Sequence, residues 1–275
     1  LLLPPLAEAT SHIRLGTGGI MVPSHQPLIV AEQLGTLQAL YPNRLDAGLG
    51  ASVGFTKPVR AALRQAANAK DHFAEDVDEI IAYLNATGEI TAYPQDRSQT
   101  PIFILTGGGS AQFAATRGAG LVLGGPAVSR GIKTSQDANQ TAVDYREAFA
   151  ESTSRGQQPH VIASINVAVA DSYEAAEQLV LSEAWALTRS RSIGVFQPLE
   201  DPAAIRAEQP SAQQQQRIDR ALASTIYGTP QDVVHQLERV LQYTLADEIM
   251  VTGNIWDPAA QQTSDRLLMA AWEQR

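Results

Sequence analysis

The sequence predicts an α/β fold of the (β/α)8 TIM-barrel type, built from parallel strands that alternate with helices. Short, continuously apolar runs alternate along the chain with longer segments whose apolar residues recur at helical spacing. The short runs are too apolar for a sheet with one wet face, which favours parallel strands covered by helices. The length of 275 residues also suits a single α/β barrel.

Six runs are predicted to be strands. The run at 101–106 is the clearest buried strand, whereas the run at 13–19 is short and rich in glycine. A Gly-containing turn precedes the fourth run, and Asp247 and Glu248 open the last one. The predicted strands cover residues 13–19, 44–50, 101–106, 120–124, 161–169 and 247–252.

Seven helices are expected between and after these strands. The first begins at Pro27, has apolar residues near helical spacing, and ends before Tyr41-Pro42-Asn43. The polar segment 197–217 receives no element, although its glutamine run is expected to be solvated helix. The predicted helices cover residues 27–40, 74–85, 110–117, 137–150, 172–189, 230–243 and 264–272.

Six strands are two fewer than a (β/α)8 barrel needs. The chain starts abruptly with Leu1-Leu2-Leu3-Pro4-Pro5, which does not resemble a signal peptide. We therefore expect that the first two βα units are missing from this sequence. Because no linker or internal repeat is evident, residues 1–275 are assigned to one barrel domain.

The composition excludes several classes of protein. A hydrophobic share of 44% with 18% charged residues excludes a wholly disordered chain, and no apolar run reaches membrane-spanning length. The formal net charge of −9, without a basic patch, disfavours nucleic acid and anionic membranes as partners. The absence of cysteine excludes thiolate chemistry and fits a cytoplasmic, reducing location.

Small and hydroxylated residues occupy the carboxyl ends of the predicted strands, where parallel α/β folds bind ligands. The strongest element is the turn Thr106-Gly107-Gly108-Gly109-Ser110, whose backbone N–H groups suit a phosphate. An equally simple interpretation is a tight turn in which Ser110 caps the next helix. The other strand ends are Thr17-Gly18-Gly19, Gly48-Leu49-Gly50, Gly124-Gly125 and Thr252-Gly253-Asn254.

Reactive side chains are scarce at these strand ends. No cluster of Asp, Glu and His has metal-binding spacing, and no lysine lies in a predicted strand. A bound cofactor is therefore expected to carry the chemistry. His25 follows the first strand and is a candidate catalytic residue, although it also suits packing or capping of the next helix. Trp185, Trp256 and Trp272 are expected to pack in the core.

Several of these segments resemble the bacterial luciferase-like monooxygenases. The resemblance covers nearly the whole chain, and its first and last segments are the specific ones. It rests on residues 13–25, 27–28, 30–33, 41–50 and 246–252.

The resemblance implies a luciferase-like TIM barrel that uses FMN, reduced by a separate NAD(P)H:flavin reductase, and O₂. It places the flavin ring at Thr17, Gly18 and Gly48, and the phosphate at the turn 106–110, with Gly124 also in the cofactor site. A homodimer is expected as well, with loose support from the apolar helix 28–40. No metal is expected.

One position departs from the family pattern. Where the family usually has an arginine that reaches the flavin phosphate, this chain has Ala51. A charge-assisted hydrogen bond contributes about 1.5–3 kcal/mol, so FMN affinity is in question. The turn 106–110 offsets part of this loss, and Arg60 or Arg64 is a possible substitute.

Three functions follow from this resemblance. The leading one is a flavin-dependent monooxygenase that oxygenates a small organic substrate through a C4a-peroxyflavin, with His25 acting on the peroxide and the loops 51–70 and 190–217 as lids. The alternatives are a deazaflavin-dependent oxidoreductase and a non-catalytic flavin-binding protein. Nothing in the sequence identifies the organic substrate.

Overall fold

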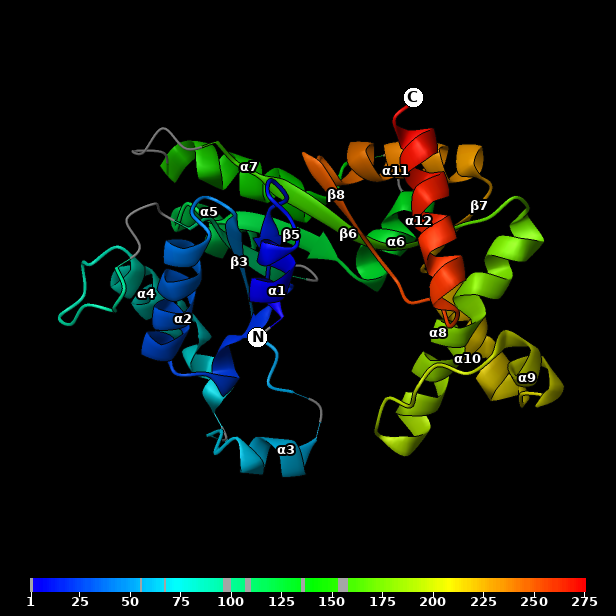
Figure 1. Ribbon diagram of the computed structural model, residues 1–275, viewed down its shortest axis with the longest axis horizontal. Coiled ribbons are helices and arrows are strands. Elements are labelled where there is room, and N and C mark those ends of the chain that lie inside the picture. The colour runs from blue at the N-terminus through cyan, green and yellow to red at the C-terminus, as the bar shows by residue number, and fades with distance from the viewer. Residues whose placement is uncertain are drawn as a thin grey trace. The chain divides into compact units, whose positions relative to one another are not determined.

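The computed structural model describes residues 2–54, 56–66, 68–95, 100–106, 110–134, 137–152 and 158–275. Contacts between residues divide the chain into two compact units, described separately below and traced in Figure 1. Unit 1 comprises Leu1–Thr106, Gln112–Leu121 and Glu151–Pro159. Unit 2 comprises Gly107–Ala111, Val122–Ala150 and His160–Arg275.

The strands of unit 1 centre on β3 (Leu45–Gly50). Both β1 (Leu15–Gly16) and β2 (Ile20–Met21) pair with β3 in parallel, and β4 (Ile102–Thr106) pairs with β3 in the same sense. The prediction of one strand over 13–19 was therefore wrong in detail. The chain leaves the sheet at residues 17–19, where the Gly18–Gly19 peptide is cis, and rejoins it as β2.

Two helices carry most of the helical core of unit 1. The prediction of a helix over 27–40 is confirmed by α2 (Pro27–Leu40), which lies against α4 (Phe73–Leu84), as Figure 1 shows. Val30, Leu34 and Ile80 are buried in this region. The remaining helices that lie wholly or largely in unit 1 are α1 (Leu3–Glu8), η1 (Val22–Ser24), α3 (Lys57–Ala62), η2 (Ala69–His72) and α5 (Ala111–Thr116).

In unit 2 the longest strand is β6 (Val161–Val169), and its neighbours are parallel. Residues 162–166 pair with β8 (Glu248–Thr252), and residues 167–169 pair with β7 (Ile226–Gly228). The prediction omitted β7, because three residues are too few to give a strand pattern. The strand β5 (Gly120–Gly124) crosses the boundary between the units, and its bounds agree with the prediction.

Two predictions for the helices of unit 2 need correction. The unassigned polar segment contains two helices, the second of which begins with a capping box of Ser211 and Gln214. The last helix begins at Pro258, because the Asp257 side chain accepts a hydrogen bond from the N–H of Ala259. The helices are α6 (Pro126–Thr134), α7 (Gln140–Ser152), α8 (Tyr173–Ile193), α9 (Pro202–Ala207), α10 (Ala212–Leu222), α11 (Pro230–Thr244) and α12 (Pro258–Trp272). Of the helices described, none has the length and apolar character that would let it cross a membrane.

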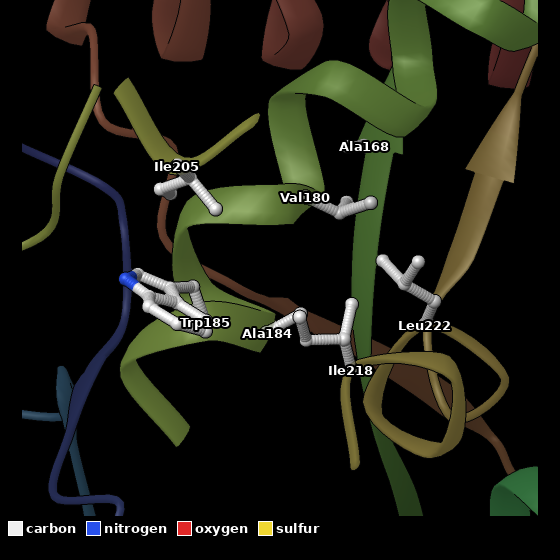
Figure 2. Close-up of a cluster of buried hydrophobic side chains, with 7 residues drawn as sticks. All are labelled: Ala168, Val180, Ala184, Trp185, Ile205, Ile218 and Leu222. Carbon is white, nitrogen blue, oxygen red and sulfur yellow. The ribbon is translucent and has the colours of Figure 1, made fainter. Parts of the chain in front are cut away.

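A buried apolar cluster joins α8, α9 and α10 to β6 in unit 2. Figure 2 shows Trp185 of α8 beside Ala184, with Ile205 of α9 and Ile218 of α10 close to the same helix. Trp185 is 2% exposed, which confirms its predicted core position. Its indole Nε1 has no hydrogen-bond partner among the described residues. This cluster anchors α9, which the sequence pattern did not reveal, and α10, of which only the glutamine run was expected to be helical.

Candidate functional site

Thr17 joins the ends of two neighbouring strands in unit 1. Its hydroxyl donates to the carbonyl oxygen of Gly48 and accepts from the N–H of Gly48, with both distances 2.9 Å. The N–H of Thr17 donates to the carbonyl oxygen of Asp46 at 3.1 Å. The predicted ring-side residues Thr17 and Gly48 are therefore in direct contact, and they leave no ionisable group at this point.

Glycines lie where the segment that follows β1 runs beside β3. A Cβ at Gly48 would overlap the carbonyl oxygen of Thr17, and a Cβ at Gly19 would lie 2.8 Å from the carbonyl oxygen of Gly48. The backbone segments are thus too close for side chains between them. A Cβ at Gly18, in contrast, would meet no atom within 4 Å. We call Gly18, Gly19 and Gly48 the glycine ledge. Of the three, Gly18 and Gly19 are exposed and Gly48 is buried.

His25 is held by its own turn beside η1. Its Nδ1 lies 2.8 Å from the carbonyl oxygen of Met21, and its N–H donates to the carbonyl oxygen of Val22 at 2.9 Å. Because a carbonyl can only accept, Nδ1 carries the hydrogen and Nε2 points elsewhere. The side chain is exposed, and no side chain caps the start of α2, so His25 is not a helix cap. The hydrogen bond to Met21 orients the ring and leaves Nε2 without a contact to this carbonyl.

The predicted phosphate-binding residues are only partly described. Thr106 is the half-buried last residue of β4, and Ser110 is half-buried directly before α5. Gly107, Gly108 and Gly109 lie outside the described residues, so their contacts are not part of the site as described. Within unit 2, a Cβ at Gly124 would lie 3.3 Å from the Cβ and the carbonyl oxygen of Ser164. The end of β5 therefore packs closely on β6.

A polar cluster at the carboxyl end of β8 was missed by the sequence reasoning. The carboxylate of Glu183 on α8 accepts from the side-chain amides of Asn166 at 3.0 Å and Asn254 at 3.1 Å. Thr252 donates to the Asn166 side-chain oxygen at 2.7 Å. Within the described part of the chain, Glu183 forms no ion pair. Thr252 and Asn254 were visible as strand-end residues, but nothing local marks Glu183, which lies in the middle of a helix.

Two tyrosines pair near the carboxyl end of β6, where Tyr227 lies opposite Ala168. The hydroxyl of Tyr173 donates to that of Tyr227 at 2.9 Å, and the ring centroids are 5.0 Å apart. Burial and this hydrogen bond raise the pKa of Tyr227 above its ordinary value. The raised pKa keeps the Tyr227 phenol in its neutral, hydrogen-bonding form to a higher pH than that of a free tyrosine.

The described residues contain no group of three or more His, Asp or Glu side chains that can hold a metal ion. Beside β1 and β3, unit 1 offers glycine backbone, the Thr17 hydroxyl and the His25 imidazole. Neutral groups of this kind are typical of sites that hold an organic cofactor through shape and hydrogen bonds.

Comparison with known proteins identifies the family. The sequence model of the luciferase-like monooxygenases matches residues 2–248. The chain belongs to this family. As a luciferase-like monooxygenase, it is an oxidoreductase enzyme. A protein of Escherichia coli strain K12 that carries the same description is 33% identical over 278 residues, which cover 100% of this chain and 81% of that relative.

Solved structures of other luciferase-like proteins show the same fold. The crystal structure of apo-MsnO8 matches 98% of this chain and 81% of its own, with a TM-score of 0.79 and 26% identity. The oxygenating constituent of 3,6-diketocamphane monooxygenase from Pseudomonas putida, in complex with FMN, has a TM-score of 0.65 and 17% identity, covering 97% of this chain and 80% of that one. An F420-dependent secondary alcohol dehydrogenase has a TM-score of 0.71 and 16% identity, covering 98% and 82%. The predicted fold class, the luciferase-like TIM barrel, is confirmed.

Proposed function

We propose that this enzyme is a flavin-dependent monooxygenase that uses reduced FMN and O₂ to oxygenate a small organic substrate. The observation that carries the proposal is the glycine ledge, where open space above Gly18 adjoins the tightly packed Thr17–Gly48 contact. Family membership supports it, as does the FMN complex of a protein of the same fold. FMN reduced by a separate NAD(P)H:flavin reductase is part of the proposal.

The residues of this chain fit such a cofactor. Thr17, Gly18 and Gly48 are proposed to hold the ring, because they present peptide groups and a hydroxyl without ionisable side chains. Thr106 to Ser110, together with Gly124, are proposed for the phosphate side. When bound, reduced FMN supplies the electrons that activate O₂. The protein has to orient the substrate and exclude water.

His25 is proposed to be the catalytic proton donor. The hydrogen bond from Nδ1 to the Met21 carbonyl fixes the ring, which leaves Nε2 to hold a proton toward an oxygen atom in the site. Gln65 supports this turn, since its side-chain amide donates to the carbonyl oxygen of Pro23 at 3.1 Å and to the hydroxyl of Ser24 at 3.0 Å. A His25→Ala variant is expected to bind FMN normally and to lose coupled substrate oxygenation.

The test of the proposed cofactor is anaerobic titration with oxidised and reduced FMN, followed by fluorescence. We expect the wild-type protein to bind reduced FMN. A Gly18→Val variant should keep its melting temperature, because nothing lies within 4 Å of the new Cβ, but it should bind FMN much more weakly. Failure of the wild-type protein to bind either form, or normal binding by the variant, would contradict the proposal.

A deazaflavin-dependent oxidoreductase is the second candidate function. The observation in its favour is the similarity to the F420-dependent secondary alcohol dehydrogenase, which has the same fold. The same titration, repeated with F420, separates the two candidates. Binding of F420 in preference to FMN would favour hydride transfer over oxygenation.

We also propose that the enzyme forms a homodimer in the cytoplasm. Ile29 and Leu40 on α2 are 45% and 61% exposed, which supports an apolar contact with a second copy. The absence of cysteine supports a reducing location. Light scattering of the purified protein measures the assembly directly.

A further inference from the structure

The polar cluster of Glu183, Asn166, Thr252 and Asn254 holds a carboxylate at the end of β8. Thr252 is the last residue of β8 and lies opposite Asn166 of β6 in the sheet. All four residues belong to unit 2. Parallel α/β folds bind their ligands at the carboxyl ends of the strands. The position of the cluster in the fold therefore favours contact with a ligand.

The hydrogen bonds of Glu183 orient its carboxylate without neutralising it. One carboxylate oxygen accepts from the side-chain amide of Asn254 at 3.1 Å. The other accepts from the side-chain amide of Asn166 at 3.0 Å and from the backbone N–H of Asn254 at 3.4 Å. These donors are all neutral, and each carboxylate oxygen has room for a further donor. Asn254 is exposed, and its side-chain oxygen receives no hydrogen bond from the described residues.

The elements around Glu183 contain no cation that could neutralise it. Residues 161–172, 173–188 and 247–265 include no Lys or Arg. Within the described part of the chain, none of the ion pairs involves Glu183. The side chain is half-buried, so its charge is only partly screened by water. A carboxylate in this setting attracts a positively charged group of a ligand.

An organic cation suits this cluster better than a metal ion does. Among the described residues, no group of three or more His, Asp or Glu side chains can hold a metal. An ammonium group has three N–H donors and needs only one carboxylate. Trp256, two residues beyond Asn254, is 45% exposed, so its expected core position is wrong. No arginine of the described residues stacks on its ring, and aromatic faces attract ammonium groups.

We propose that Glu183 binds the ammonium group of an amine-bearing substrate. The carboxylate supplies the charge, and Asn166 and Asn254 are positioning residues that hold it at the end of β8. The ammonium N–H groups donate to Glu183 and to the free side-chain oxygen of Asn254. The substrate of the monooxygenase is then a small organic amine, and not a carboxylate or sulfonate, which Glu183 repels. This inference rests on the proposed function.

The test measures the preference of the protein for a cation over a neutral molecule of the same shape. The probes are benzylamine, which is protonated at neutral pH, and benzyl alcohol. Their dissociation constants are measured by saturation-transfer-difference NMR for the wild-type protein and for Glu183→Gln and Glu183→Asp, with and without saturating FMN. The matched control is Glu174→Gln, which changes the net charge equally at an exposed residue of the same helix. The ratio of the two constants is the readout, because a partly unfolded variant loses both affinities alike.

We expect the wild-type protein and Glu174→Gln to bind benzylamine about tenfold more tightly than benzyl alcohol. The preference should disappear in Glu183→Gln, whereas Glu183→Asp, which keeps the charge, should retain about threefold. A wild-type protein without the preference, a Glu183→Gln variant that keeps it, or an equal loss in Glu174→Gln overturns the inference. If the wild-type protein prefers benzylamine but does not bind FMN, the proposed function fails while the ammonium site stands, so the two failures are distinguishable.

Discussion

Replacing Gly48 with alanine tests the packing that forms the glycine ledge. The added methyl group would overlap the carbonyl oxygen of Thr17 and lie 3.0 Å from Cδ1 of Leu105. Gly48 is buried, so the neighbouring strand has to move rather than a flexible side chain. The movement separates Thr17 from the Gly48 N–H and C=O, and both hydrogen bonds of the threonine hydroxyl are lost.

The expected loss of stability has two parts, the steric overlap and the loss of the Thr17 hydrogen bonds. Overpacking of a tight interior typically destabilises by about 1–3 kcal/mol, and each lost hydrogen bond adds about 0.5–1.5 kcal/mol. We therefore expect the free energy of unfolding to fall by about 2–6 kcal/mol. In a chain of this size that lowers the melting temperature by roughly 5–15 °C.

The assay is thermal unfolding followed by circular dichroism, with two comparison variants. Gly50→Ala lies in the same strand, and its Cβ would approach nothing closer than the Ile20 carbonyl oxygen at 3.9 Å, so its melting temperature should stay within about 2 °C of the wild type. Thr17→Val removes only the hydrogen bonds and should fall between the two. A Gly48→Ala protein as stable as Gly50→Ala would refute the reasoning.

Variants at three further positions test other parts of the structure. Glu183→Gln places a side-chain amide against the side-chain amide of Asn254. The free energy of unfolding, measured with urea, should fall by about 1–3 kcal/mol. No change would mean that the hydrogen bonds of Glu183 contribute nothing to stability. Trp185→Phe should lower the free energy of unfolding by about 1 kcal/mol, because the indole N–H has no partner among the described residues. Trp185→Ala should lower it by about 3–5 kcal/mol, because the side chain is buried. Equal losses in the two variants would contradict this account. Arg44→Met removes bonds to the carbonyl oxygens of Ala7 and Thr10 and should speed hydrogen exchange over residues 7–13, without affecting α12.

The sequence predicted the elements whose pattern is long and consistent. Helix α2 agrees at both ends, because Pro27 marks its start and Tyr41-Pro42 its end. Strand β7 was missed because it is only three residues long. Helix α9 was missed, and only the glutamine run of α10 was expected to be helical, because the apolar contacts that hold both helices come from α8 and β6. Those contacts are made with residues distant in the sequence, so the local sequence, which is polar, does not indicate them.

The candidate site shows the same division between local and tertiary information. Glycines and hydroxyls at predicted strand ends are local signals, and the structure brings two of the residues chosen on that basis, Thr17 and Gly48, into direct contact. Glu183 was missed, since its role depends on the pairing of β6 with β8, which brings Asn166 opposite Thr252. The cofactor-binding functions of Thr17, Gly18 and Gly48 stay predictions.

Because α3 buries none of its residues, its sequence is free of the constraints that a core imposes. Its start is secured locally, as the Thr56 hydroxyl accepts a hydrogen bond from the N–H of Val59. Exposed residues of α3 can therefore be substituted with little effect on stability. In protein engineering, this makes α3 a stretch of the surface that tolerates changes of sequence as long as its cap is kept.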